Sequence, residues 1–263
     1  MVIDFHAHVY PDKIASRAVD NIEEFYGLTM QGKGTVQELL ESGRAGGVDR
    51  FIVFSAAAVP GQTGRINEYI SSVCREHPEC TGFGTLHPDV PDPGEEIERI
   101  VSLGLKGLKL HPDMQKFNID DHRMMKIYSL LEGKLPVIFH TGDYRYSYSH
   151  PARLRAVLEK YPKLTAVAAH FGGWSVFDVA LEHLLDPFCY FDISSSLPFL
   201  GKKRAVELIR IYGSRRFLFG SDYPMWDPGQ CLREFLELDL TDSEKENILY
   251  KNALEILKEG EPL

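Results

Sequence analysis

The first apolar run of the chain covers residues 2–5. Two histidines, His6 and His8, follow it and are separated by one residue. On an extended strand, residues i and i+2 point to the same face, so the two imidazoles would lie side by side. Two neutral imidazoles held in this way form half of a first-row metal site. A strand can also carry paired histidines on its surface, so a metal site needs further ligands from elsewhere in the chain.

Further residues of ligand type stand at the ends of other short apolar runs. Lys109 and His111 lie at the end of one run, and His140 closes the next. His170 closes a third, and Asp222 lies two residues beyond the last. Histidines and one carboxylate without a cysteine suit zinc, manganese or iron. Such an ion lowers the pKa of its bound water to about 7, and an unliganded histidine or the carboxylate of Asp222 could then carry the proton.

The runs that carry these residues read as eight buried strands, each followed by a helical pattern. Near-continuous apolar runs are typical of strands covered on both faces, as in a parallel sheet. Eight βα units predict an α/β fold with a single (β/α)₈ TIM barrel, whose active site lies at the C-terminal ends of the strands. A doubly wound open sheet is the competing fold, but no GxGxxG follows the first run. The predicted strands cover residues 2–8, 50–55, 81–86, 105–110, 135–140, 164–170, 189–193 and 216–220. The predicted helices begin near residues 11, 35, 64, 93, 120, 151, 175 and 198, and two closing helices follow. Residues 35–38 and 241–244 each have the form of a capping box, which is expected to open the second helix and the last one.

Composition bounds the class of protein. The 263 residues show no linker and no shift in composition, so we expect one domain over 1–263. A net charge of −9 disfavours nucleic acid as a partner. We expect no signal peptide and no membrane span, because no apolar run approaches the ~20 residues that cross a bilayer. The four cysteines form no CxxC pair, which is typical of reduced thiols in a cytoplasmic protein.

Five segments carry these residues in barrel order: His6-Ala7-His8, GLKLHP at 107–112, FHTG at 139–142, AHFGG at 169–173 and GSDYP at 220–224. Together they resemble the amidohydrolase superfamily. The likeness is greatest to its branch of metal-dependent TIM-barrel hydrolases that includes aminocarboxymuconate-semialdehyde decarboxylase. The resemblance extends over essentially the whole chain.

The resemblance implies a divalent metal site, with one Zn²⁺ expected and Mn²⁺ or a second ion as alternatives. The implied ligands are His6, His8, His140 and Asp222. His170 would be a catalytic histidine in one-metal relatives and a ligand of the second ion in two-metal relatives. Lys109 matches the carboxylated lysine that bridges two ions in the latter, while a neutral or paired lysine at the barrel mouth is the alternative.

The loop at residues 141–151 is rich in tyrosine and carries Arg145, which could bind a carboxylate in bidentate fashion. Tyr144, His111 and Trp174 are further candidate substrate contacts. These features predict a metal-dependent hydrolase that uses a metal-activated water on a small, carboxylate-bearing molecule. The alternative is a decarboxylase on the same site, in which His170 moves a proton. A third hypothesis, a binding protein with a relic site, conflicts with the complete ligand set. The sequence leaves a homodimer open.

Overall fold

The computed structural model describes residues 1–186 and 188–259. They form two compact units. The first unit comprises residues 1–55, 73–81 and 193–259. The second unit comprises residues 56–72 and 82–192. A single domain over the whole chain remains the prediction from composition.

The first unit is built around β1 (Ile3–His8), which pairs in parallel with β2 (Arg50–Phe54). Almost every residue of β1 is buried, because elements cover both of its faces. The register of the pair shifts between Asp4 and Ala7. On its other side, β1 meets the segment that follows β9 (Phe217–Leu218), through a bridge from Ala7 to Tyr223. β1 therefore lies between β2 and the segment that carries Asp222.

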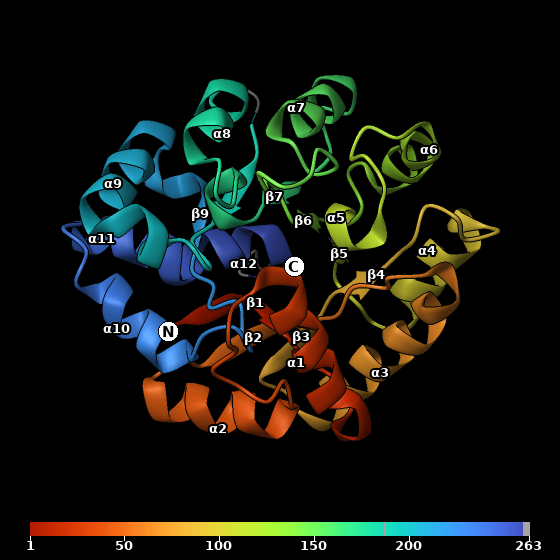
Figure 1. Ribbon diagram of the computed structural model, residues 1–263, viewed down its shortest axis with the longest axis horizontal. Helices are drawn as coiled ribbons and strands as arrows, with labels where there is room; N and C mark the ends of the chain where they lie inside the picture. The colour runs from red at the N-terminus through yellow and green to blue at the C-terminus, as the bar shows by residue number, and fades with distance from the viewer. Residues whose placement is uncertain (187, 260–263) are drawn as a thin grey trace. The chain divides into compact units, whose positions relative to one another are not determined.

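Helices surround these strands in the first unit. They are α1 (Asp12–Tyr26), α2 (Val36–Gly46), α9 (Leu197–Tyr212), α10 (Pro228–Leu236), α11 (Asp242–Glu246) and α12 (Asn252–Leu257). Helix α10 packs against α2, and the two run side by side at the lower left of Figure 1.

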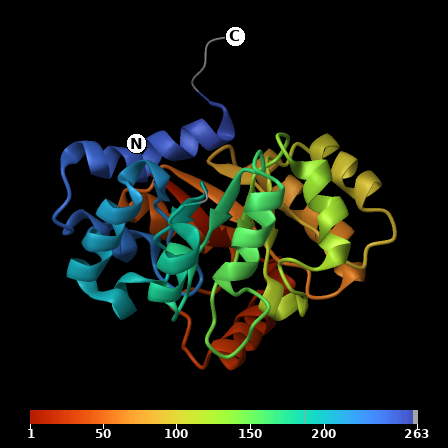
Figure 2. The same ribbon diagram turned by 90° about the horizontal axis from the view of Figure 1, so that it is seen from above.

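A π-helical turn at residues 247–251 joins α11 to α12, and the three form the blue stretch at the top of Figure 2. Within this turn, the carbonyl of Ile248 accepts a hydrogen bond from the Phe219 amide, just beyond β9. The side-chain amide of Asn252, at the start of α12, donates to the Phe217 carbonyl in β9. The closing helices thereby hold the strand that leads to Asp222.

The second unit is a parallel sheet in the order β4 (Gly84–Thr85), β5 (Leu108–Leu110), β6 (Val137–Phe139), β7 (Ala166–Ala168) and β8 (Tyr190–Asp192). All residues of these strands are buried, as the apolar runs predict. Its helices are α4 (Pro93–Ser102), α5 (Pro112–Gln115), α6 (His122–Leu131), α7 (Pro151–Lys160) and α8 (Phe177–Leu184). Helices α7 and α8 are neighbours at the top of Figure 1. Helix α3 (Thr63–Glu76) has residues in both units.

The structure corrects two details of the predicted elements. The predicted strand at 81–86 is two short strands, β3 (Cys80–Gly82) and β4, because the chain changes partner around Phe83. Thr35 caps α2 as expected, but Glu38 does not close a capping box and instead accepts from the Lys33 amide and the Tyr223 hydroxyl. The box at Thr241 and Glu244 is confirmed.

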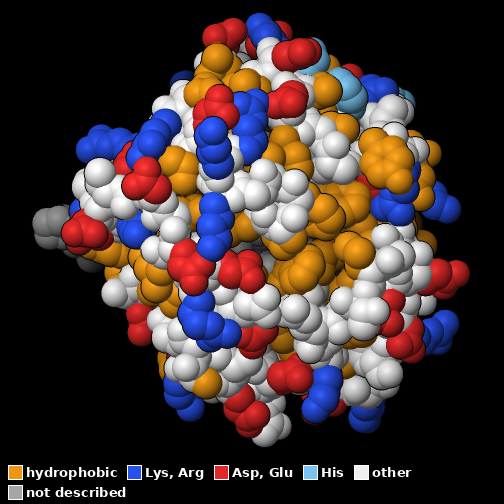
Figure 3. Space-filling model, turned by 60° about the vertical axis from the view of Figure 1, so that its left-hand side comes forward, with side chains coloured by type: hydrophobic (Ala, Val, Ile, Leu, Met, Phe, Trp, Pro, Cys, Tyr) orange, Lys and Arg blue, Asp and Glu red, His pale blue; other side chains and the backbone are white. Residues whose placement is uncertain are grey.

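The surface in Figure 3 intersperses acidic, basic and apolar side chains. Lys202 of α9 pairs with Glu237, the residue after α10, and Arg204 pairs with Glu207 within α9. Opposite charges therefore neutralise one another on this part of the first unit. Among the described residues, no helix combines the length and apolarity needed to cross a membrane.

Candidate metal centre and catalytic residues

Three of the predicted ligands meet at the end of β1 in the first unit. His6 Nε2 lies 3.3 Å from Asp222 Oδ1, and His8 Nε2 lies 3.6 Å from the same oxygen. The His6 side chain is fully buried, and those of His8 and Asp222 are only 13% and 12% exposed. Both rings pack edge-on against Phe54, which fixes their planes. Two imidazole nitrogens and one carboxylate oxygen thus converge.

The spacing of these donor atoms fits a divalent first-row ion. Zinc binds imidazole nitrogen and carboxylate oxygen at roughly 2.0–2.2 Å, so tetrahedral ligand atoms are about 3.3–3.6 Å apart. The observed separations of 3.3 and 3.6 Å from Asp222 Oδ1 match this geometry. Two imidazoles and a carboxylate are also a donor set of catalytic zinc sites, which keep a further position open. The residues present therefore fit a divalent metal.

The backbone places Asp222 opposite β1. Its amide donates to the His6 carbonyl over 2.8 Å, and the His8 amide donates to the Tyr223 carbonyl over 2.7 Å. Asp222 has a φ of +64°, in the left-handed region that aspartate tolerates better than most residues. Backbone of this kind costs of order 1 kcal/mol and is found at functional sites. The conformation turns the carboxylate toward the two histidines.

Beneath the ligands, the fully buried Asp4 joins β1 to the Asp222 segment. Its Oδ1 accepts from the amides of His6 and Ser221 at 3.0 and 2.9 Å, and its Oδ2 accepts from the Ser221 hydroxyl at 2.5 Å. Gly220 lets the two segments approach, because a Cβ at this position would lie 2.9 Å from the Cβ of His6. Asp4 thereby sets the distance between His6 and Asp222.

Serines that follow β8 contact two of the ligands, a role that their sequence context did not predict. The Ser194 hydroxyl lies 3.1 Å from His6 Nδ1, the ring nitrogen that faces away from Asp222. The Ser195 hydroxyl donates to Asp222 Oδ2, the oxygen that does not face the histidines. Each of these ligands is thus held by a hydroxyl on its far side.

The second unit gathers His111, Asp113, His140 and His170 at the ends of β5, β6 and β7. His140 Nδ1 lies 3.1 Å from His170 Nε2, so the two rings share a hydrogen bond. His140 Nε2 faces Asp113 Oδ2 at 3.6 Å, beyond hydrogen-bonding distance. All four side chains are almost completely buried.

His111 stacks on His140, with ring centroids 4.0 Å apart and planes 8° from parallel. The lone pair of an imidazole nitrogen lies in the ring plane. An ion about 2.1 Å from both rings would therefore sit well out of at least one plane. His111, Asp113 and His140 lie close enough to be considered as ligands, but the stacking disfavours a shared ion. His111 instead supports the His140 ring and caps α5, with its Nδ1 accepting from the Met114 amide.

Asp113 is a buried carboxyl beside His140. Burial raises the pKa of Asp113 to about 6, the charge of Asp143 adds to the rise, and the Ser149 hydroxyl bonded to Oδ2 opposes it. Its Oδ1 is buried and lacks a hydrogen-bond partner among the described residues. The carboxyl therefore exchanges protons more readily near neutral pH than an exposed aspartate does.

Lys109, the predicted bridging residue, lies fully buried in β5 of the second unit. It is in register with Ile138 of β6, and its carbonyl accepts from the Thr85 hydroxyl. Its part in a two-metal site remains a prediction.

In the loop after β6, Arg145 is held by contacts with residues of the second unit, chiefly Asp143 of the same loop. Arg145 donates through Nε and Nη2 to the carboxylate of Asp143, at 2.9 and 2.7 Å, and its guanidinium lies over the rings of Tyr146 and Trp174. Trp174 is buried, whereas Tyr144 is 74% exposed. A carboxylate of the same loop therefore already occupies one edge of Arg145.

The structure thus brings together His6, His8 and Asp222 in the first unit and His140, His170 and His111 in the second. The prediction that His140 completes the ligand set of the first three stays a prediction. The missed residues gave little signal: serine after a strand is common, and its partners lie far away in the sequence.

Comparisons with known proteins agree with this architecture. A family model described as amidohydrolase matches residues 3–258. No curated protein matches the sequence. Among solved structures, an uncharacterised TIM-barrel protein from Bordetella bronchiseptica matches with a TM-score of 0.78 at 21% identity, over 98% of each chain.

Two decarboxylases are also similar in structure. 2,6-Dihydroxybenzoate decarboxylase, in complex with 2,6-dihydroxybenzoate, gives a TM-score of 0.77 at 16% identity over 98% of each chain. A dihydroxybenzoic acid decarboxylase from a Polaromonas species, with bound manganese and the inhibitor 2-nitroresorcinol, gives 0.76 at 15% identity. That match covers 98% of this chain and 96% of the other. The predicted α/β TIM-barrel fold is confirmed, and the chain belongs to the amidohydrolase family.

Proposed function

We propose that this protein is a metal-dependent decarboxylase of a small, carboxylate-bearing aromatic molecule. The proposal is carried by the convergence of His6 Nε2, His8 Nε2 and Asp222 Oδ1 at distances that suit a divalent ion. Family membership and the likeness to barrel decarboxylases support the reaction class. Hydrolysis, the first reaction expected from the sequence, takes second place because both named enzymes among these neighbours are decarboxylases.

His6, His8 and Asp222 would hold the ion, and the family resemblance adds His140 as the fourth ligand. Manganese is favoured beside zinc, because the Polaromonas enzyme binds it. A bound divalent ion would supply positive charge that binds the oxygens of an acidic substrate and stabilises the charge that develops when CO₂ leaves.

His170 is the proposed proton carrier. In decarboxylation, the bond from the substrate carbon to its carboxylate breaks, the electron pair stays on that carbon, and one proton replaces the departing CO₂. His170 is a buried imidazole with a ring nitrogen bonded to His140, which holds it in one orientation. An imidazole has a pKa near neutrality, which suits both delivery and recovery of that proton.

The loop after β6 provides the proposed substrate contacts. Arg145, oriented by Asp143, would bind an anionic group of the substrate. The buried face of Trp174 and the rings of His111 and Tyr144 offer aromatic surface.

The direct test is metal-dependent release of CO₂. Protein stripped with a chelator and reloaded with Mn²⁺ or Zn²⁺ should convert at least one member of a panel of hydroxylated benzoic acids and muconate-like acids. CO₂ and product should appear in equal amounts, and the product should gain one deuterium when the reaction runs in D₂O. A product that gains water without loss of CO₂ would favour hydrolysis instead.

Substitution of the proposed ligands distinguishes an effect on metal binding from an effect on folding. His6→Ala and Asp222→Asn should lose bound metal and activity while the far-ultraviolet circular dichroism stays that of the wild type. His122→Ala is the matched control, because the His122 side chain is 92% exposed at the start of α6. Wild-type protein that binds no stoichiometric metal, or activity that survives chelators, would contradict the proposal.

A further inference from the structure

Ser195 connects Asp222 to the loop that follows it. Its hydroxyl contacts Asp222 Oδ2, Nε1 of Trp226 at 2.9 Å, and Sδ of Met225 at 3.1 Å. All three partners belong to residues 222–226, although Ser195 itself follows β8. Ser195 is buried and has a φ of +50°. This unusual backbone turns the hydroxyl toward the Asp222 loop.

The hydroxyl has only one proton, and its contacts determine where that proton goes. The indole N–H of Trp226 is a donor only, so Ser195 Oγ accepts from it. The Ser195 proton is then free for an acceptor, and the carboxylate of Asp222 is a stronger acceptor than the thioether of Met225. The hydrogen bonds therefore run in one direction, from Trp226 to Ser195 to Asp222.

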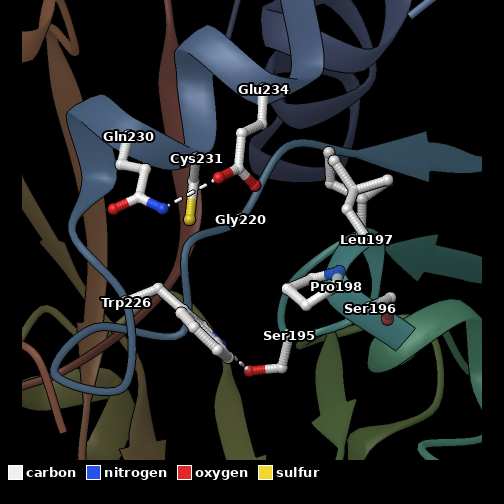
Figure 4. Close-up of a pocket in the computed structure, with 10 residues that line it drawn as sticks. Ser195, Ser196, Leu197, Pro198, Gly220, Trp226, Gln230, Cys231 and Glu234 are labelled. Carbon is white, nitrogen blue, oxygen red and sulfur yellow. Dashed lines mark hydrogen bonds between the residues drawn. The ribbon is translucent and has the colours of Figure 1, made fainter. Parts of the chain in front are cut away.

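Figure 4 shows this arrangement at the edge of a pocket in the first unit, where the Trp226 indole nitrogen points at the Ser195 hydroxyl. Ser195 and Trp226 both line this pocket, together with Cys231 and Glu234 of α10. The same short loop thus supplies the candidate ligand Asp222 and the indole that orients the hydroxyl bonded to it.

We propose that Ser195, oriented by Trp226, is a positioning residue for the metal-binding carboxylate of Asp222. Its bond to Oδ2 holds the carboxylate plane so that Oδ1 faces His6 and His8, 3.3 and 3.6 Å away. Without it, the carboxylate would rotate more freely about its Cβ–Cγ bond, and an oxygen would face the two imidazoles for less of the time. The inference rests on the proposed metal site and identifies two residues that tune its affinity.

The test measures metal affinity directly, without substrate. The dissociation constant of Mn²⁺ is measured by isothermal titration for metal-free wild type, Ser195→Ala, Ser195→Gly and Trp226→Phe. Both Ser195 variants should bind Mn²⁺ about 10- to 100-fold more weakly, the usual effect of removing a hydrogen bond to a ligand. Gly suits the positive φ, so equal losses in the Ala and Gly variants assign the effect to the hydroxyl rather than to the backbone.

Ser196→Ala is the matched control. Ser196 is the buried neighbour of Ser195, but its hydroxyl donates to the Ser194 carbonyl. This variant should keep wild-type affinity. Trp226→Phe should weaken binding less than Ser195→Ala, and it should add nothing in the Ser195→Ala background because its acceptor is already gone.

Two outcomes overturn the inference, and they are distinguishable. Wild type that binds Mn²⁺ at one equivalent together with a Ser195→Ala variant of equal affinity would remove the positioning role and leave the proposed function intact. Wild type that binds no divalent ion would remove both.

Discussion

His140 Nδ1 lies 3.1 Å from His170 Nε2, so one proton is shared between two buried rings. If that proton resides on His140, His140 Nε2 carries a lone pair and can bind a metal, and His170 accepts. If the proton resides on His170, His140 Nδ1 is the acceptor. The single N–H of the neutral His140 ring is then at Nε2, and this nitrogen cannot bind a metal. A metal at His140 therefore selects the tautomer of His170.

Replacement of His170 by Asn separates proton transfer from metal binding. Asn fills a similar space but cannot carry a proton at neutral pH. We expect kcat to fall by about 10²- to 10⁴-fold, the usual contribution of a general acid or base. Elemental analysis should find the metal content unchanged. Loss of one equivalent of metal in His170→Asn would instead indicate that His170 is a ligand of a second ion.

Arg145 offers a test of substrate charge. Arg145→Ala should raise KM for a carboxylate substrate and lower kcat/KM by about tenfold or more, since a hydrogen bond to a charged group contributes about 1.5–3 kcal/mol. Arg155→Ala is the control, because Arg155 also pairs with a carboxylate, that of Glu159, but does so within α7 rather than in the loop at 141–151. An unchanged kcat/KM in Arg145→Ala would limit Arg145 to ordering the loop with Asp143.

The barrel was predictable because its strands are short, buried on both faces and therefore almost purely apolar. Polar residues stand out where such runs end, and this feature located His6, His140 and Asp222. The placement of His6 and His8 on one face of a strand follows from their spacing of two residues alone, so it could be predicted without knowledge of tertiary contacts.

Contacts between segments far apart in the sequence were not predictable. Ser195 approaches Asp222 only after β8 and β9 have been placed, and Glu38 turns from its own helix cap to the Tyr223 hydroxyl for the same reason. Tertiary partners decide which acceptor such a side chain uses. The pair of Arg145 with Asp143 is different, because a carboxylate two residues away was visible in the sequence.

Asp4 should be important for stability as well as for the site. Asp4→Ala would leave the buried amide and hydroxyl of Ser221 without their acceptor, and each unsatisfied group costs about 1–3 kcal/mol. We expect urea unfolding to show a loss of about 3 kcal/mol or more. Asp4→Asn keeps one acceptor oxygen and should lose less. Equal stability of the Ala variant and the wild type would contradict this role.

The stability of the second unit should depend on the protonation of His150. His150 caps α7, and its Nδ1 accepts from the Ala152 amide over 3.2 Å, which requires an unprotonated nitrogen. Burial lowers the pKa of His150 from 6.5, and the charges of His183 and Arg153 lower it further. Below pH 6.5 the unfolded chain binds this proton more readily than the folded chain does. Stability is therefore fully present above pH 6.5 and decreases as the pH falls toward the lowered pKa.

His150→Asn tests this dependence, because Asn caps helices well and does not titrate. Urea unfolding at pH 7 and pH 5 should show a smaller loss of stability in the variant than in the wild type, by about 1 kcal/mol, the usual value of a helix cap. His122→Asn controls for the removal of a histidine, since the His122 side chain is exposed. If His150→Asn loses as much stability between the two pH values as the wild type, protonation of His150 does not weaken the cap. The acid sensitivity would then arise from other buried groups, such as His87, whose pKa burial also lowers.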